Sequence, residues 1–366
     1  MPIIDPRPYD AVLLVSFGGP EQPEDVLPFL ENVTRGRGIP RERLEEVGRH
    51  YFEFGGRSPI NDQNRALLAA IEADFAATGL DLPVYWGNRN WDPYLPDTIR
   101  QMRDDGVRRA ACFVTSAYSS YSGCRQYREN LAAAVAQVDG APQLDRLRHY
   151  FNHPGFLEPV VDATVTALQQ VGAPEHSAQV LFVTHSIPVS MNAASGPSGE
   201  GYTTQHQQAM AEVMQRVTQR LGLTAAAELV YCSRSGPPSV PWLEPDVNAR
   251  IEDLAGQGVT RVVLVPIGFV SDHMEVIYDL DTEALATAAG AGVQAVRAAT
   301  PGVDARFVSV VRELLLERAA AERGERPERA TWGTAGPATD RCAVGCCPNP
   351  RAELPALGGL DDVTAR

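Results

Sequence analysis

Three acidic residues recur every fourth position in the segment SDHMEVIYDLDTE, residues 271–283. They are Glu275, Asp279 and Glu283, and His273 lies two residues before the first of them. In a helix this spacing places all three carboxylates on one face. A solvated helix face is the simpler interpretation, but like charges at this spacing repel one another. We favour the alternative, in which the row supplies hard oxygen ligands that a divalent cation visits in turn.

A second candidate residue, His185, directly follows the apolar run VLFVT, residues 180–184. The acidic segment follows another apolar run, residues 261–268. In open parallel sheets, ligands bind beyond the carboxyl ends of the strands, so we expect both sites to face one cleft. A histidine at a strand end also often satisfies a neighbouring backbone group, and this interpretation stays open on the residues alone.

The elements that must position these residues follow an α/β pattern, in which short apolar runs alternate with helical periodicity. Amphipathic spacing predicts helices over 66–77 and 308–323. We predict two similar Rossmann-like lobes, each a parallel sheet flanked by helices, with a cleft between them. The expected boundaries are 1–170 and 171–325 for the lobes and 326–366 for a tail. Six runs are predicted to be strands: 11–17, 83–87, 111–118, 180–186, 228–234 and 261–269.

The composition limits the classes of partner. The apolar content of 44% and charged content of 21% are typical of a soluble globular protein. The net charge, 32 − 46 = −14, argues against binding to nucleic acid and to anionic lipid. The sequence has no apolar stretch long enough to span a membrane and no secretory signal, so we expect a cytoplasmic protein.

Six stretches together resemble the ferrochelatases, which insert Fe²⁺ into a porphyrin. The resemblance implies a chelatase-type fold in which His185 and Glu275 face each other across the porphyrin cleft as the catalytic residues. One would accept pyrrole protons and the other would bind the metal, and the assignment between them stays open. Asp279 and Glu283 would complete the metal-binding residues. The stretches are LLVSFGGPEQPEDV, FGGRSPI, GNRNWDPYLPDTIRQM, VTHSIP, SRSGPPSVPWLEPDV and VPIGFVSDHMEVIYDLD.

The segment 31–56 is charged, whereas animal-type ferrochelatases have an apolar lip there that meets the membrane. In this respect the chain resembles the bacterial, actinobacterial-type enzymes that act on coproporphyrin III. The four propionates of that substrate require cationic and hydroxyl partners. Several of those enzymes have a tyrosine at the position of Phe17, and a phenylalanine cannot ligate iron. For each arginine a solvated surface role is the competing interpretation. The expected substrate-binding residues are Phe17, Arg35, Arg37, Arg49, Ser58 and Tyr127.

Three cysteines, Cys342, Cys346 and Cys347, crowd into the segment CAVGCCPNP near the C-terminus. Some ferrochelatases hold a [2Fe–2S] cluster with cysteines near the C-terminus and one cysteine from far upstream. The resemblance therefore implies such a cluster here, with Cys124 as the fourth ligand and Cys232 in reserve. Four thiolates also suit Zn²⁺, which is the competing interpretation.

The resemblance implies a coproporphyrin III ferrochelatase, a lyase of haem biosynthesis that uses Fe²⁺ as a substrate and passes its product to the next enzyme of that pathway. A protoporphyrin IX ferrochelatase or another tetrapyrrole chelatase is the nearest alternative. A non-catalytic porphyrin or haem carrier is a second alternative. His185, Glu275 and the acidic row argue against it, because a carrier requires neither a proton acceptor nor a metal route. An iron–sulfur redox protein is a third alternative, and only the cysteines support it.

Overall fold

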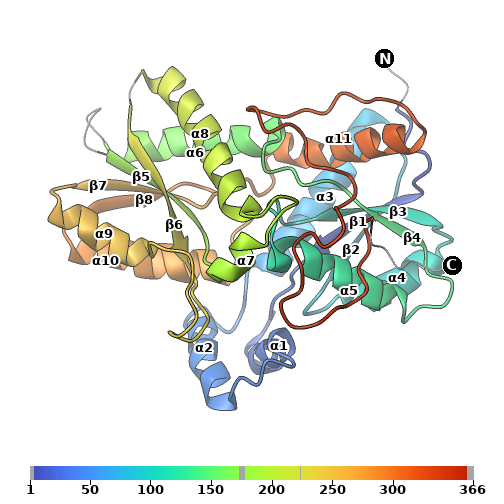
Figure 1. Ribbon diagram of the computed structural model, residues 1–366, viewed down its shortest axis with the longest axis horizontal. Coiled ribbons are helices and arrows are strands. Elements are labelled where there is room, and N and C mark those ends of the chain that lie inside the picture. Colours follow the sequence, from blue (N-terminus) through green and yellow to red (C-terminus); the bar gives the residue numbers. More distant parts are fainter. Residues whose placement is uncertain (1–3, 173–177, 223, 361–366) are drawn as a thin grey trace.

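The computed structural model describes residues 4–172, 178–222 and 224–360, and this part of the chain forms two four-stranded parallel sheets (Figure 1). Their strand orders are β2-β1-β3-β4 and β6-β5-β7-β8, so the two sheets repeat one topology. The predicted fold class, two similar parallel sheets flanked by helices, is confirmed. The strands are β1 (Ala11–Ser16), β2 (Val84–Asn88), β3 (Arg109–Val114), β4 (Gln143–Arg146), β5 (Ala178–His185), β6 (Ala226–Cys232), β7 (Arg261–Val265) and β8 (Gln294–Arg297).

The edge strands β4 and β8 were not predicted from the sequence. Their sequences are QLDR and QAVR, and each pairs with a neighbour on one side only. An edge strand of four residues needs no continuous apolar run, so it lacks the pattern by which the other six were recognised. The runs 111–118 and 261–269 also extend beyond their strands, because the chain leaves the sheet at Val114 and Val265.

Helices cover both faces of the first sheet. Successive strand residues point to opposite faces, so Val12 and Leu14 enter one core while Leu13 and Val15 enter another. The first core includes side chains of α3 (Ile60–Thr78), α6 (Pro154–Gln170) and α11 (Ala305–Glu322), and the second those of α4 (Leu95–Asp104) and α5 (Gln126–Val135).

The second sheet is covered in the same way, and one core runs through both lobes. Phe182 packs with α8 (Gly201–Leu221) in the same apolar cluster as Val12 of the first sheet. The connection is made by α6, which packs against both α8 and α11. The predicted lobe boundaries stay a prediction, and residues 361–366 of the predicted tail lie outside the described part. The opposite face is covered by α9 (Val247–Gly256), the π-helix η3 (Val276–Ala284) and α10 (Leu285–Gly290).

Several short elements lie around the junction of the two lobes. The pair α1 (Val26–Val33) and α2 (Arg41–Glu53) projects below it in Figure 1, after the 3₁₀ turn η1 (Pro23–Asp25). The others are the π-helical turn η2 (Tyr121–Arg125) and α7 (Val189–Ala193). After α11 the chain returns over α5, drawn in red in Figure 1.

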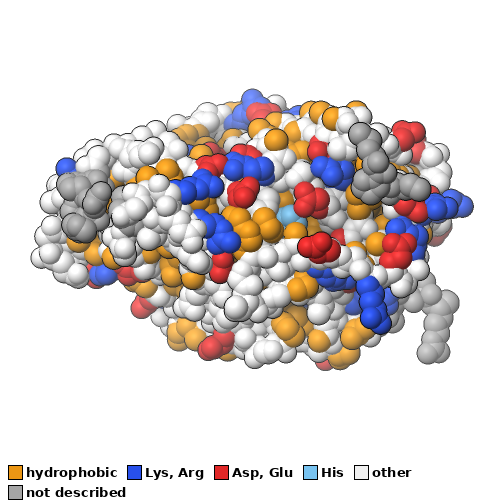
Figure 2. Space-filling view, turned by 90° about the horizontal axis from the view of Figure 1, so that it is seen from above, with side chains coloured by type: hydrophobic (Ala, Val, Ile, Leu, Met, Phe, Trp, Pro, Cys, Tyr) orange, Lys and Arg blue, Asp and Glu red, His pale blue; other side chains and the backbone are white. Residues whose placement is uncertain are grey.

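None of the helices in the described ranges is long and apolar enough to cross a membrane. On the face seen in Figure 2, the described acidic and basic side chains are interspersed and do not form one large basic patch.

Candidate active site

His185 and Glu275 form an ion pair in which Nε2 of His185 lies 3.5 Å from Oε1 of Glu275. His185 is the last residue of β5, and its Nδ1–H donates to the Ser186 carbonyl, which leaves Nε2 directed at Glu275. The Tyr202 hydroxyl donates to the His185 carbonyl at 2.8 Å and fixes the end of the strand. The side chains of the pair are 31% and 46% exposed, so the pair is accessible from solvent.

Each member of the pair shifts the pKa of the other. Burial disfavours the charged imidazole, but Glu275, the Ser186 carbonyl and Asp279 outweigh it and raise the pKa of His185 to about 9. Burial also disfavours the charged carboxylate, and His185 outweighs it and lowers the pKa of Glu275 to about 2. The free protein therefore holds an imidazolium–carboxylate pair at neutral pH.

The two residues lie side by side at 3.5 Å, so the expectation that they face each other across a cleft is wrong. His185 ends β5 and Glu275 follows β7, and these strands are neighbours in the second sheet. Neighbouring parallel strands lie about 4.8 Å apart, which brings the residues at their carboxyl ends into contact.

The acidic row lies on η3, which is a π-helix. Asp279 accepts a hydrogen bond from the Ser233 hydroxyl just beyond β6. Burial raises the pKa of Asp279 to about 7, and the charges of Glu275 and Glu283 add to this effect. Glu283 is exposed, so the row leads from the half-buried ion pair to the surface. Within the described residues no three His, Cys, Asp or Glu side chains are arranged as a metal site, and the metal-binding role of the row stays a prediction.

Next to the acidic row lies an aromatic wall made of Phe17, Phe29, Tyr51 and Trp91. Burial raises the pKa of Tyr51, and the nearby charges of Glu275 and Asp279 add to the effect, which places α2 close to the row. The ring centroid of Phe29 lies 6.1 Å from Tyr51, 6.2 Å from Phe17 and 6.1 Å from Trp91. The wall therefore connects the ion pair with the carboxyl end of β1, which Phe17 follows.

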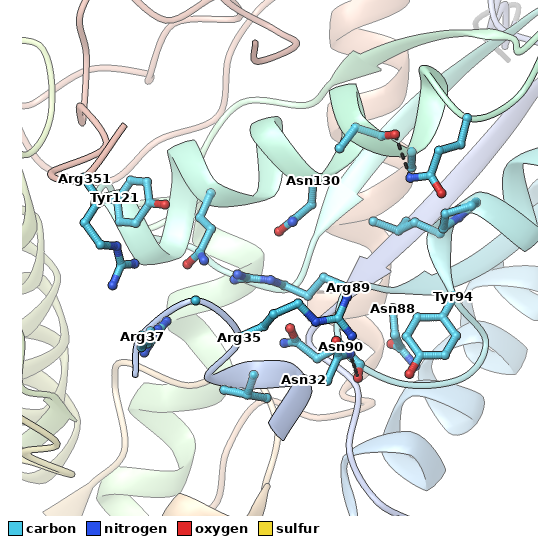
Figure 3. A pocket seen from close by; sticks show the side chains of 18 residues that line it. Asn32, Arg35, Arg37, Asn88, Arg89, Asn90, Tyr94, Tyr121, Asn130 and Arg351 are labelled. Carbon is cyan, nitrogen blue, oxygen red and sulfur yellow. Dashed lines mark hydrogen bonds between the residues drawn. The ribbon is translucent and has the colours of Figure 1, made fainter. Parts of the chain in front are cut away.

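Beyond the wall, Arg35 and Arg37 line a pocket of about 490 Å³, which we call the arginine pocket (Figure 3). Arg89 follows β2 and also lines the pocket, with its guanidinium 5.4 Å from the ring centroid of Phe17. The pocket and the aromatic wall thus share a boundary. Arg49 lies exposed on α2 and does not line the pocket.

Ser58 and Tyr127 are buried, with exposed fractions of 4% and 5%. Ser58 lies at the start of α3 against Gly19, where an added Cβ would lie 2.6 Å from the Ile60 side chain, so this close approach requires glycine. Tyr127 lies under Arg89, whose guanidinium is 4.8 Å from its ring centroid. Both residues border the region of the wall and pocket, and direct substrate contact by either stays a prediction.

The structure brings the four predicted cluster cysteines together: Cys124, Cys342, Cys346 and Cys347 form one buried group. All four are free thiols, and the sulfurs of Cys346 and Cys347 lie 3.7 Å apart. Cys232 lies elsewhere, at the end of β6, where the Ser233 hydroxyl donates to its sulfur at 3.3 Å. The structure thus places Cys124, and not Cys232, with the three tail cysteines, and their role as ligands of a cluster stays a prediction.

Two N–H groups of other segments donate to sulfurs of the cysteine group. The Gly196 N–H donates to the sulfur of Cys347 at 3.1 Å, and the Arg146 guanidinium donates to that of Cys342 at 3.5 Å. Hydrogen bonds from Cys124 and Cys346, with the charge of Arg146, lower the pKa of Cys342. Hydrogen bonds among the cysteines, together with burial, raise the pKa of each of the other three thiols. The four thiols therefore carry one favoured thiolate, at Cys342.

The sequence reasoning missed three residues that line the arginine pocket: Arg89, Tyr121 and Arg351. Arg89 lies in the quoted stretch GNRNWDP, directly after a strand, and this position at a carboxyl end is a signal that could have identified it. Arg351 follows the cysteine segment in a stretch without periodicity, so no local pattern connects it with a site more than two hundred residues away.

Comparison with known proteins assigns the class. The ferrochelatase family model matches residues 9–319, and the chain belongs to the ferrochelatase family. The coproporphyrin III ferrochelatase of Streptomyces griseus is 58% identical over 98% of both chains, and that of Streptomyces coelicolor is 56% identical over the same shares. The ferrochelatase of Rhodopirellula baltica is 47% identical, over 96% of this chain and 97% of its own.

Among solved structures, SirB from Bacillus subtilis with Fe³⁺ matches with a TM-score of 0.49 and 12% identity. The match covers 86% of this chain and 97% of that one.

Proposed function

We propose that this protein inserts Fe²⁺ into coproporphyrin III, forming iron coproporphyrin for haem biosynthesis. The observation that carries the proposal is the identity of 56–58% with two coproporphyrin III ferrochelatases over 98% of the chain. At this coverage the relatives align with nearly the whole chain. The alternatives of a carrier or a redox protein have no comparable support.

The ion pair supplies the groups that metallation requires. Insertion of Fe²⁺ must remove two pyrrole protons and replace the water ligands of the cation. Glu275 offers a carboxylate oxygen to the metal, and His185 offers Nε2 as the proton acceptor once its own proton has left. Asp279 and Glu283 extend from Glu275 toward solvent on η3 and would serve the metal or the released protons.

The aromatic wall and the arginine pocket match the two parts of the substrate. A porphyrin is a flat apolar ring, and the half-buried Phe17 and Tyr51, which pack on the buried Phe29, offer it an aromatic surface near the acidic row. Its propionates require charged partners, and Arg35 and Arg37 lie at the far end of that surface. The chain would thus hold the ring with its carboxylates at the arginines and its centre near His185.

We also propose that Cys124, Cys342, Cys346 and Cys347 hold a [2Fe–2S] cluster. Their burial as one group, with two N–H donors on the sulfurs, supports this assignment. When bound, such a cluster can accept and release one electron. The thiols themselves join the tail to η2. The cytoplasmic location and the transfer of product to the next enzyme stay predictions.

The test is the visible spectrum of coproporphyrin III mixed anaerobically with Fe²⁺ and protein. Wild-type protein should convert the four-band spectrum of the free porphyrin to the two-band spectrum of the metallated one. His185→Ala should lower the rate by about a hundredfold or more, the contribution of a general base, while retaining porphyrin binding. Conversion of protoporphyrin IX but not coproporphyrin III by the wild type would refute the substrate, and a near wild-type rate for the variant would refute the role of His185.

A further inference from the structure

The pocket beyond the aromatic wall gathers four guanidiniums from three distant parts of the chain. Arg35 and Arg37 come from the loop between α1 and α2, Arg89 follows β2, and Arg351 comes from the C-terminal tail (Figure 3). Asparagine, glutamine and tyrosine side chains make up most of the remaining polar lining, and the lining contains no Asp or Glu.

The arginine pocket lacks its own counter-charge. In the part of the chain that the structure describes, no carboxylate forms an ion pair within 4.0 Å of any of the four guanidiniums. Burial lowers the pKa of Arg37, and the positive charges of Arg351 and Arg89 lower it further. The Nε of Arg89 is buried and has no hydrogen-bond partner among the described residues. Four crowded guanidiniums in a chain of net charge −14 indicate a site for an anionic ligand.

The ligand chemistry follows from the position of the pocket. Arg89 contacts the rings of both Phe17 and Tyr127, so an anion in the pocket lies at the edge of the aromatic wall. A ligand with a flat apolar body and carboxylates at its rim satisfies both surfaces at once. Guanidinium groups bind carboxylates with two parallel hydrogen bonds, which suits the propionates of a porphyrin.

The tail reaches the pocket through the cysteine group. Cys346 and Cys347 precede Arg351 by five and four residues, and Asn349 between them donates to Glu129 of α5 at 3.0 Å. On the other side, the one-turn element η2 carries both Cys124, in the cysteine group, and Tyr121, in the pocket lining beside Arg351. Each of the two segments therefore connects the cysteine group directly with the pocket.

We infer that Arg351 is a further substrate-binding residue, which contacts a propionate of the porphyrin, and that the four-cysteine group is the anchor that holds it in the arginine pocket. The inference rests on the proposed function, because it takes the tetracarboxylate porphyrin as the ligand. It assigns the cysteine group a positioning role: the thiols act on the substrate through Arg351, whether or not electrons move through a cluster.

The first arm of the test measures binding of coproporphyrin III without iron, from the change in porphyrin fluorescence. Arg351→Gln should raise the Kd about tenfold, since a charge-assisted hydrogen bond is lost. Arg341→Gln is the matched control, because it removes an exposed guanidinium from the same tail outside the pocket, and it should leave the Kd unchanged. Arg351 is exposed, so its substitution does not threaten folding.

The second arm uses Cys347→Ser, which removes a thiolate and should abolish any visible absorption of an iron–sulfur cluster. The Kd for coproporphyrin III should rise as much as in Arg351→Gln, and the double variant should show no further increase, because both changes remove one contact. Trypsin should also cleave the tail after Arg351 faster than in the wild type. Thermal unfolding of each variant monitors the fold.

The outcomes separate the two proposals. If wild-type protein neither binds nor metallates coproporphyrin III, the proposed function fails. If the wild type does both and Arg351→Gln binds as tightly, this inference alone is overturned. If Arg351→Gln weakens binding but Cys347→Ser does not, the positioning role of the cysteine group is overturned.

Discussion

Glu275 already has a positively charged partner in the free protein, so an arriving cation competes with the His185 imidazolium for one carboxylate. The two side chains are 3.5 Å apart. In the proposed mechanism the metal and the proton would therefore occupy neighbouring atoms of one ion pair. This geometry would allow a single pair of residues to serve both halves of a metallation.

At the residue scale, Glu275→Gln should lower the pKa of His185 from about 9 toward its ordinary value of about 6.5, because burial then acts without the compensating charge. The measurement is an NMR titration of the imidazole in metal-free protein. Glu283→Gln is the control, since it neutralises the exposed end of the row away from His185. An unchanged pKa in Glu275→Gln, or an equal shift in the control, would contradict the pairing.

At the element scale, a close contact between β5 and the segment after β7 sets the position of Glu275. The Gly268 N–H donates to the Val183 carbonyl at 3.2 Å. A Cβ at Gly268 would lie 2.1 Å from the Thr184 hydroxyl oxygen and 2.9 Å from the Thr184 Cα. Only glycine allows this approach, which aligns the start of the acidic segment with His185.

Gly268→Ala should therefore destabilise the protein by about 1–3 kcal/mol through overpacking. It should also lower the rate of iron insertion, because relief of the clash moves the segment that carries Glu275. Urea unfolding and the metallation assay measure the two effects. Gly256→Ala is the matched control: an added Cβ there meets no atom within 4 Å, and because alanine is the better helix former its stability should stay unchanged or rise by up to about 1 kcal/mol. Equal stability of the two variants would be inconsistent with the contact.

Local sequence patterns predicted the strands that are long and continuously apolar and missed those that are short and polar. The buried runs at β1 and β5 were recognised, whereas β4 and β8 were not, since four polar-rich edge residues carry no period. The carboxylate row was recognised, but its π-helical form was not, because i,i+4 spacing fits both helix types. That Arg351 and Arg89 line one pocket depends on long-range packing, such as the hydrogen bond from the Arg125 guanidinium to the Leu354 carbonyl, 229 positions away.

At the scale of the whole molecule, His206 of α8 lies where the two lobes meet. Its ring stacks on Tyr118 of the first lobe with centroids 3.5 Å apart, and the Tyr118 hydroxyl donates to the Ile267 carbonyl of the second. Nδ1 of His206 hydrogen-bonds the Tyr202 carbonyl at 2.7 Å, so Nε2 carries no proton. Nε2 is buried and has no partner in the described residues, which makes protonation costly.

Burial lowers the pKa of His206 to about 3, and burial likewise lowers that of His149 to about 3 and that of His153 to about 4. Between pH 6.5 and these values the unfolded chain binds protons that the folded chain does not. Stability therefore falls as the pH falls through this window. The pKa of Asp279 is raised to about 7, so this group binds a proton more readily in the folded chain and favours folding as the pH falls. Its effect offsets the loss of stability from one of the three histidines.

His206→Gln isolates one contribution to this acid sensitivity. Below the unfolded pKa of about 6.5 a single buried neutral histidine contributes at most about 1.4 kcal/mol of lost stability per pH unit. The free energy of unfolding is measured by urea titration from pH 7.5 to 5. As the pH falls, it should decrease less steeply in the variant than in the wild type, and the two slopes should differ by up to about 1.4 kcal/mol per pH unit. The amide can keep the bond to Tyr202, so the comparison concerns the slope rather than the absolute stability. Parallel curves for the two proteins would mean that His206 is protonated in the folded state, and the junction of the lobes would then have to accommodate a buried charge.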